Sequence, residues 1–115
     1  MKYIIVEKHV TDFPNPIMVK KNEKVIIEKE FDEDYPNWFF CRKLDGSNSG
    51  WVPEQIIKKE SCYGIITEDY YAKELNVEKG YIINGFKELN GWIWCECENT
   101  NEIGYVPLEK IKVLE

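Results

Sequence analysis

The sequence predicts an all-β protein that consists of two small five-stranded barrels in tandem. Three observations support this prediction. The chain has 115 residues, enough for two units of about 57 residues each. Its apolar residues occur in short runs of β-branched and aromatic side chains, and no stretch of ten residues has helical periodicity. The second half of the chain also repeats the first.

The repeat is found when the chain is shifted by 54 residues against itself. Trp51 then falls on Tyr105, which keeps an aromatic ring at that position. Upstream of an inserted acidic loop the offset becomes 58. Agreement at fixed spacing, broken only by a loop insertion, is typical of a duplicated unit, so we predict one domain over residues 1–60 and another over 61–115. Identical pairs at offset 54 include Trp38 and Trp92, Cys41 and Cys95, Gly50 and Gly104, Val52 and Val106, Pro53 and Pro107, and Ile57 and Ile111.

Each half contains three runs that are typical of strands. Turn-forming pairs such as Asp45-Gly46 and Asn90-Gly91 separate them. Short strands at such close spacing favour a small barrel. The join between the halves, residues 58–61, is too short for a flexible tether, so we expect the barrels to share a fixed interface. The predicted strands cover residues 25–31, 38–44, 50–52, 81–86, 92–98 and 103–106.

The net charge of −6 comes from 15 basic and 21 acidic residues, and residues 61–115 carry −5 of it. Such a surface repels phosphate backbones and anionic lipid heads, so neither nucleic acid nor a membrane is an expected partner. The N-terminal apolar run has four residues, whereas a secretory signal needs about 7–15 and a membrane helix about 20. We therefore expect a cytoplasmic protein whose cysteines are reduced thiols.

Three short patterns occur in the same order in both halves. An apolar strand leads into a lysine-containing turn, a tryptophan opens the next strand, and a Gly-aromatic-Val-Pro string follows. They cover residues 17–27, 37–41 and 50–53 in the first half, and 75–83, 91–95 and 104–107 in the second. These patterns resemble the Src-homology-3 (SH3) family, and more closely the variant SH3 domains found in bacterial proteins. The resemblance covers nearly the whole chain and implies two SH3-like barrels.

In that family a shallow groove lined by aromatic side chains binds proline-rich segments in the polyproline II conformation. The resemblance thus implies a non-enzymatic, adaptor-type module that binds proteins or peptides at two degenerate grooves. Non-aromatic residues stand at some groove positions, namely Thr11 and Glu68, and Ile56 and Lys110. The groove residues implied by position are Trp38 or Trp92, Pro53 or Pro107, Trp51 or Tyr105, and, from the first loop, Phe13 or Tyr70.

The inserted acidic loop suggests which half binds. Asp32, Glu33 and Asp34 could provide a counter-charge for Lys or Arg in a proline-rich or basic ligand, although such runs are also common in solvated loops. Tyr35, beside Trp38, would add cation–π contacts. We therefore predict the binding site in the first half.

Two other functions remain open at this stage. The chain could be a structural or homodimerising domain pair whose aromatic faces are buried, or it could recognise a cell-wall glycan or peptide, as some bacterial relatives of the fold do. Apolar residues follow both Trp38 and Trp92, and neighbours on a strand point to opposite faces, which favours exposure of both tryptophans. Their exposure separates binding from a purely structural role.

The cysteines and the one histidine do not form a recognisable catalytic or metal motif. Cys41 and Cys95 occupy equivalent positions, which favours buried structural thiols. Cys95 and Cys97 share a strand face, whereas zinc sites need four ligands, usually from pairs on turns. We therefore predict no metal, no cofactor and no enzymatic activity, and we expect His9 at a surface or a sheet edge.

Overall fold

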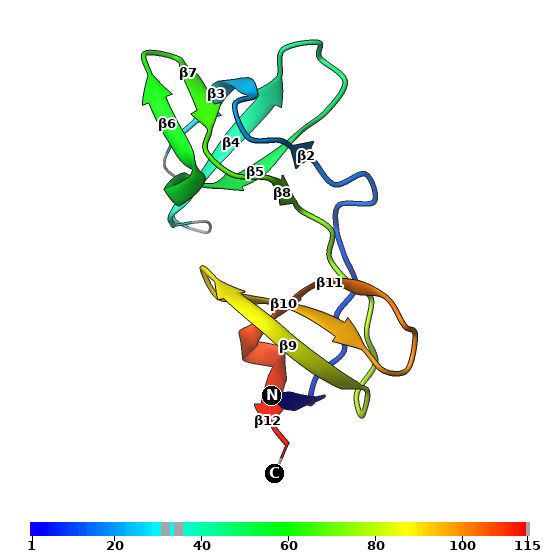
Figure 1. The fold of residues 1–115 in the computed structure, drawn as a ribbon. Coiled ribbons are helices and arrows are strands. Elements are labelled where there is room, and N and C mark those ends of the chain that lie inside the picture. The colour runs from blue at the N-terminus through cyan, green and yellow to red at the C-terminus, as the bar shows by residue number, and fades with distance from the viewer. Residues whose placement is uncertain (31–32, 34–35, 115) are drawn as a thin grey trace. The chain divides into compact units, whose positions relative to one another are not determined.

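In a computed structural model, which describes residues 1–30, 33 and 36–114, the regular elements are strands and two short 3₁₀ helices (Figure 1). This confirms the predicted all-β class. The strands are β1 (Lys2–Ile5), β2 (Met18–Val19), β3 (Lys24–Lys29), β4 (Trp38–Lys43), β5 (Ser49–Pro53), β6 (Ile57–Glu60), β7 (Tyr63–Ile66), β8 (Tyr70–Tyr71), β9 (Ile82–Leu89), β10 (Trp92–Cys97), β11 (Ile103–Pro107) and β12 (Ile111–Val113). The 3₁₀ helices are η1 (Glu54–Ile56) and η2 (Leu108–Lys110).

The chain forms two compact units, but neither is a contiguous half. The terminal unit contains residues 1–14 and 73–115, and the central unit contains residues 15–72. The predicted division into residues 1–60 and 61–115 therefore has to be corrected. The repeat offset shows which strands of the two halves are equivalent. It does not show whether the first strand of a half pairs with strands of its own half or with strands of the other half.

Each unit has a five-stranded antiparallel sheet with the same internal order. The order is β11-β10-β9-β1-β12 in the terminal unit and β5-β4-β3-β7-β6 in the central unit, where β2 and β8 form an additional pair. In the terminal unit β1 pairs with β9 and β12. In the central unit β7 takes the same place between β3 and β6. The strand that opens each half of the sequence thus completes the barrel of the other half.

The expected join at residues 58–61 is a hairpin inside the central unit. Strand β6 ends at Glu60, Ser61 adopts a left-handed φ of 59°, and β7 begins at Tyr63. The charge asymmetry between the halves also disappears in the units. The central unit has 8 basic and 11 acidic residues and the terminal unit has 7 and 10, so each carries −3.

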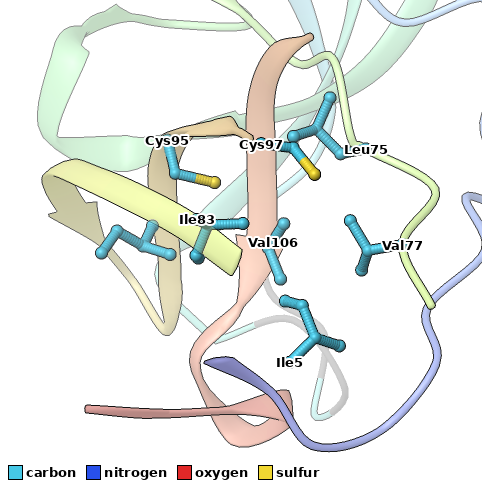
Figure 2. Packing of buried hydrophobic residues seen from close by; sticks show 8 residues of the cluster. Ile5, Leu75, Val77, Ile83, Cys95, Cys97 and Val106 are labelled. Atoms are coloured by element: carbon cyan, nitrogen blue, oxygen red, sulfur yellow. The ribbon is translucent and has the colours of Figure 1, made fainter. Parts of the chain in front are cut away.

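Each unit surrounds a small aliphatic core. The strand that comes from the other half of the sequence, β1 in the terminal unit and β7 in the central unit, is called the exchanged strand here and covers one side of that core. In the terminal unit Ile5 of β1 points into the same cluster as Val106 of β11 (Figure 2). In the central unit Ile66 of β7 is fully buried in the equivalent place. Cys41 and Cys95 have no exposed surface, which confirms their prediction as buried thiols. The terminal core comprises Ile5, Leu75, Val77, Ile83, Ile93, Cys95, Cys97 and Val106.

Candidate functional site

In the central unit a tryptophan and a tyrosine pack together where β4 begins. Trp38 lies opposite Pro53 of β5, and its ring centroid is 6.4 Å from that of Tyr70, with the ring planes inclined at 57°. Both aromatic residues are only 9% exposed, and Pro53 is buried. The expectation that Trp38 is exposed is therefore wrong, because Tyr70 packs against the ring. The structure does bring together Trp38, Pro53 and Tyr70, three of the predicted groove residues.

Trp51, another aromatic candidate of this unit's groove, packs on a neighbour that the sequence did not single out. It pairs with Phe40 across β4 and β5, and the ring centroids lie 5.1 Å apart in an edge-to-face arrangement. Both side chains are half-buried. The terminal unit has the same arrangement, since Trp94 and Tyr105 lie edge to face at 4.8 Å. Strand pairing could have predicted both contacts, because each pair is directly opposite across a hairpin.

The residue that occupies the place of Tyr70 in the terminal unit is His9, not Phe13. His9 bridges to Val77 as Tyr70 pairs with Val19, and these two valines are 58 residues apart, the offset of the repeat. The His9 ring lies edge to face with Trp92 at 5.7 Å. The prediction that Phe13 and Tyr70 are equivalent first-loop residues is wrong, because His9 takes the place of Tyr70. Phe13 is 39% exposed, and its amide donates a hydrogen bond to the hydroxyl oxygen of Thr11, at 3.0 Å.

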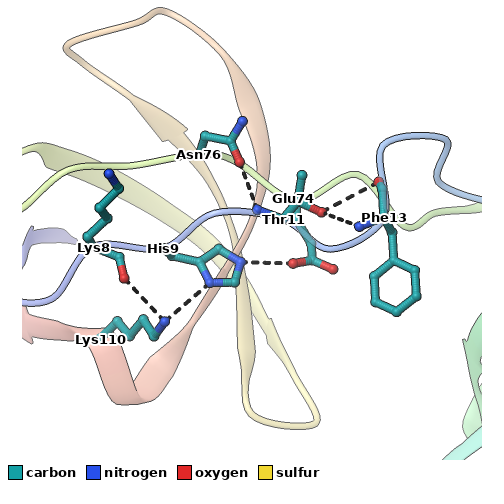
Figure 3. A network of polar contacts seen from close by, with 7 residues as sticks. All are labelled: Lys8, His9, Thr11, Phe13, Glu74, Asn76 and Lys110. Carbon is teal, nitrogen blue, oxygen red and sulfur yellow. Dashed lines mark hydrogen bonds and ion pairs between the residues drawn. The ribbon is translucent and has the colours of Figure 1, made fainter.

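His9 is the centre of a polar network (Figure 3). Its Nε2 lies 2.8 Å from Oε1 of Glu74, and its Nδ1 lies 3.4 Å from Nζ of Lys110, which also donates to the carbonyl of Lys8 at 3.2 Å. An ammonium group can only donate, so Nδ1 accepts and the Nε2 hydrogen is directed at Glu74. The side chains of His9 and Glu74 are only 11% and 12% exposed, so His9 is not a surface residue, and its isolated bridge to Val77 fits the alternative expectation of a sheet edge. The partners lie 65 residues apart, and no sequence motif joins them.

The network gives a test of stability in the terminal unit. Glu74→Ala leaves the buried Nε2 hydrogen of His9 without its acceptor, so we expect a loss of about 1–3 kcal/mol in the free energy of unfolding. Glu78→Ala is the matched control, because its ion pair with Lys8 is more than half exposed and is worth about 0–1 kcal/mol. Urea unfolding of both variants measures the difference. Equal losses would show that the Glu74 contact is no stronger than a surface pair.

The other predicted site residues lie in the terminal unit or in the acidic loop, and part of that loop is outside the described residues. Pro107 is buried and Trp92 and Tyr105 are half-buried in the terminal unit. Glu33 is exposed, while Asp32, Asp34 and Tyr35 lie outside the described residues. Two further acidic residues, Glu68 and Asp69, are exposed just before Tyr70. The sequence reasoning did not select them.

Across residues 1–30, 33 and 36–114, no group of three or more His, Cys, Asp and Glu side chains is arranged to hold a metal ion. The cysteines at 41, 62, 95 and 97 are free thiols, and that at 62 is exposed. In the described part of the chain no helix is long and apolar enough to cross a membrane.

Comparison with protein-family models matches residues 2–60 to the variant SH3 domain family. The chain belongs to this family. Searches of the curated proteins and of the solved structures find no match. SH3 domains are generally protein-interaction modules, which places the chain in that broad class. The matched segment runs from β1 to β6, although β1 belongs to the terminal unit and β7 completes the central one.

Proposed function

We propose that this SH3 protein is a non-enzymatic module that binds a protein or peptide, and that the central unit provides the contact surface. The observation that carries the proposal is the contact of Trp38 with Tyr70 beside Pro53. The exposed parts of these two rings, with the buried Pro53 beside them, offer a rigid apolar surface on which a polyproline II segment can dock with little loss of entropy.

The terminal unit is less suited to an apolar ligand. His9 stands where the central unit has Tyr70, and Lys110 stands where it has Ile56. The polar atoms of His9, Lys110 and Glu74 bond one another, so a proline-rich segment would have to desolvate them without replacing those bonds. We therefore propose that any ligand contact of this unit is the weaker of the two.

The charge near the proposed surface favours a basic ligand. The exposed carboxylates of Glu68 and Asp69 immediately precede Tyr70, and the exposed Glu33 lies five residues before Trp38. The central unit as a whole carries −3. Lys or Arg next to the proline-rich segment would gain from this potential, and binding would weaken as salt screens it.

The affinity should be low. Trp38 and Tyr70 expose only their edges, and an aromatic contact at an exposed site contributes about 1 kcal/mol. A few such contacts hardly exceed the entropy lost on docking, so we expect a dissociation constant that is micromolar or weaker.

The four tryptophans provide a direct test, because Trp38 and Trp51 belong to the central unit and Trp92 and Trp94 to the terminal unit. We expect a PxxP peptide flanked by arginines to shift the indole N–H resonances of the first two in a ¹⁵N-correlated NMR spectrum. The same peptide with its prolines replaced by alanine is the control. Shifts confined to Trp92 and Trp94 would place the site on the terminal unit.

Three variants identify the contact side chains in this titration. Trp38→Ala should abolish binding, whereas Trp92→Ala should weaken it only slightly. Because Trp38 is nearly buried, Tyr70→His is the gentler variant, since it introduces the residue that the terminal unit has in this place. We expect it to lower affinity about tenfold while the NMR spectrum stays native.

A structural role is the second candidate, and the 9% exposure of Trp38 and Tyr70 is the observation that favours it. In that case Trp38→Ala would unfold the central unit, and no peptide would move any indole resonance. The two candidates therefore give opposite results in the same titration.

A further inference from the structure

The two exchanged strands occupy equivalent places with matching backbone hydrogen bonds. The Ile5 amide donates to the carbonyl of Tyr81 at 2.8 Å, and the Ile66 amide donates to that of Glu23 at 2.8 Å. These two acceptors are 58 residues apart, the offset of the repeat. The other matching bonds are Gly80 to Ile5 and Asn22 to Ile66, Val6 to Lys110 and Thr67 to Ile56, and Gly85 to Met1 and Ile27 to Cys62. Backbone bonding therefore does not decide which strand enters which barrel.

The side chains of the two strands differ at two positions, and the second of these decides the packing. Tyr3 of β1 and Gly64 of β7 are equivalent, two residues before Ile5 and Ile66. In the terminal unit the ring of Tyr3 lies against Gly85 of β9. A Cβ at Gly85 would come within 2.4 Å of Cδ1 of Ile93 and within 2.9 Å of Cε2 of Tyr3. Gly85 thus leaves a space that Tyr3 and Ile93 fill together.

The central unit has the reverse combination. Ile27 of β3 stands where the terminal unit has Gly85, and it is 8% exposed. A Cβ on Gly64 would lie 2.5 Å from Cγ2 of Ile57 on β6 and 3.3 Å from Cδ1 of Ile27, so here the exchanged strand supplies the small residue and its two neighbouring strands supply the large ones. The same space is therefore filled once in each unit, from opposite sides.

We propose that these two pairs, Tyr3 with Gly85 and Gly64 with Ile27, select the exchanged arrangement over two consecutive barrels. In a consecutive arrangement Tyr3 would face Ile27 and overfill the central unit. Gly64 would face Gly85 and leave a void as large as a side chain in the terminal unit. Close-packed interiors tolerate neither change well.

A second contact at the preceding position favours the same arrangement. Lys2 of β1 pairs with Glu98 at 3.0 Å, whereas the equivalent Tyr63 of β7 lies under the ammonium of Lys24, 4.1 Å from its ring centroid. In the other barrel Lys2 would meet Leu44 in place of Glu98. Each strand therefore finds a partner for its polar or aromatic group only in the barrel that it occupies.

The test exchanges the large and the small residue between the two strands in the full chain. Tyr3→Gly and Gly64→Tyr alone should each lower the melting temperature by about 10 °C, through a void and through overpacking. The double variant should regain most of that loss by adopting consecutive barrels. A protease site inserted at the Ser61 turn then reports the arrangement. After cleavage the parental protein should keep its two fragments together in native mass spectrometry, whereas the double variant should release them.

Ile27→Gly with Gly85→Ile is the reciprocal reversal, made from the sheet side, and it should give the same release. The proposal is overturned if the cleaved parental protein separates into fragments. It is also overturned if neither double variant recovers the stability lost in its single variants, or if the recovered double variants keep their fragments together. A failed peptide titration would leave this result unaffected, because fragment release does not depend on ligand binding.

Discussion

A fragment of residues 15–72 is expected to fold alone, whereas a fragment of residues 2–60 is expected to be largely unfolded. The first fragment is contiguous and contains every strand of the central unit. The second is the segment that matches the family, but it lacks β7 and β8. The two fragments have almost the same length, so chain length does not explain a difference between them.

The physical reason lies in the strand that would have to replace β7. In residues 2–60 only β1 is available, and it would bring Tyr3 against Ile27, an overpacking that costs about 1–3 kcal/mol. The fragment would also lose the contact of Trp38 with Tyr70. A barrel of this size has only about 3–5 kcal/mol of stability, so these losses remove most of it.

Circular dichroism and urea unfolding of both fragments measure the difference. We expect a cooperative transition for residues 15–72 and none for residues 2–60 at the same temperature. Adding Tyr3→Gly to the second fragment is the matched control, and it should restore part of the stability by removing the overpacking. A fragment 2–60 that is as stable as 15–72 would mean that β1 fits both barrels equally well.

The sequence was sufficient for the fold class and for most strands, because periodicity and turn residues are local signals. The strand predicted over residues 92–98 and the turn predicted at Asn90 and Gly91 are both observed, as β10 and as two left-handed residues before it. It was insufficient for the domain division. The strand sequences KYII and YGII are each suited to an inner position in either sheet. Which sheet each strand enters depends on Gly85 and Ile27, which lie far from these strands in the sequence.

The candidate site shows the same division between local and distant information. Trp38 and Pro53 were found through short motifs and lie opposite each other across a hairpin. Burial of Trp38 could not be predicted, because it depends on Tyr70, which reaches it only after β7 has entered the central unit. The contact of His9 with Glu74 joins the two sequence segments that form the terminal unit. Residue spacing alone contains no signal for this contact.

Stability is expected to fall steeply when the pH rises above 9, because two buried thiols resist ionisation. Burial, with a smaller contribution from the charge of Glu28, raises the pKa of Cys41 to about 12. Burial, with a smaller contribution from Cys97, raises the pKa of Cys95 to about 12. The ordinary pKa of a thiol is 9.0, so between pH 9 and 12 the unfolded chain releases two protons that the folded chain keeps.

The direction follows from proton linkage. The unfolded state binds fewer protons in this range, so the free energy of unfolding decreases as pH rises, by about 1.4 kcal/mol per pH unit for each thiol. Below pH 9 both states keep these protons, and the thiols add no pH dependence. Urea unfolding followed by circular dichroism between pH 8 and 10.5 measures the slope.

Single substitutions separate the thiols from other groups that ionise in this range. Cys41→Ala and Cys95→Ala should each reduce the slope by about 1.4 kcal/mol per pH unit, although each lowers stability at pH 7 by removing a buried group. A Cys95→Ala variant with the parental slope would mean that water or a conformational change lets the folded protein ionise this thiol near its ordinary pKa. The tight β10–β11 pairing around Cys95 and Gly104, where the thiol lies 3.5 Å from the glycine carbonyl, argues against that outcome.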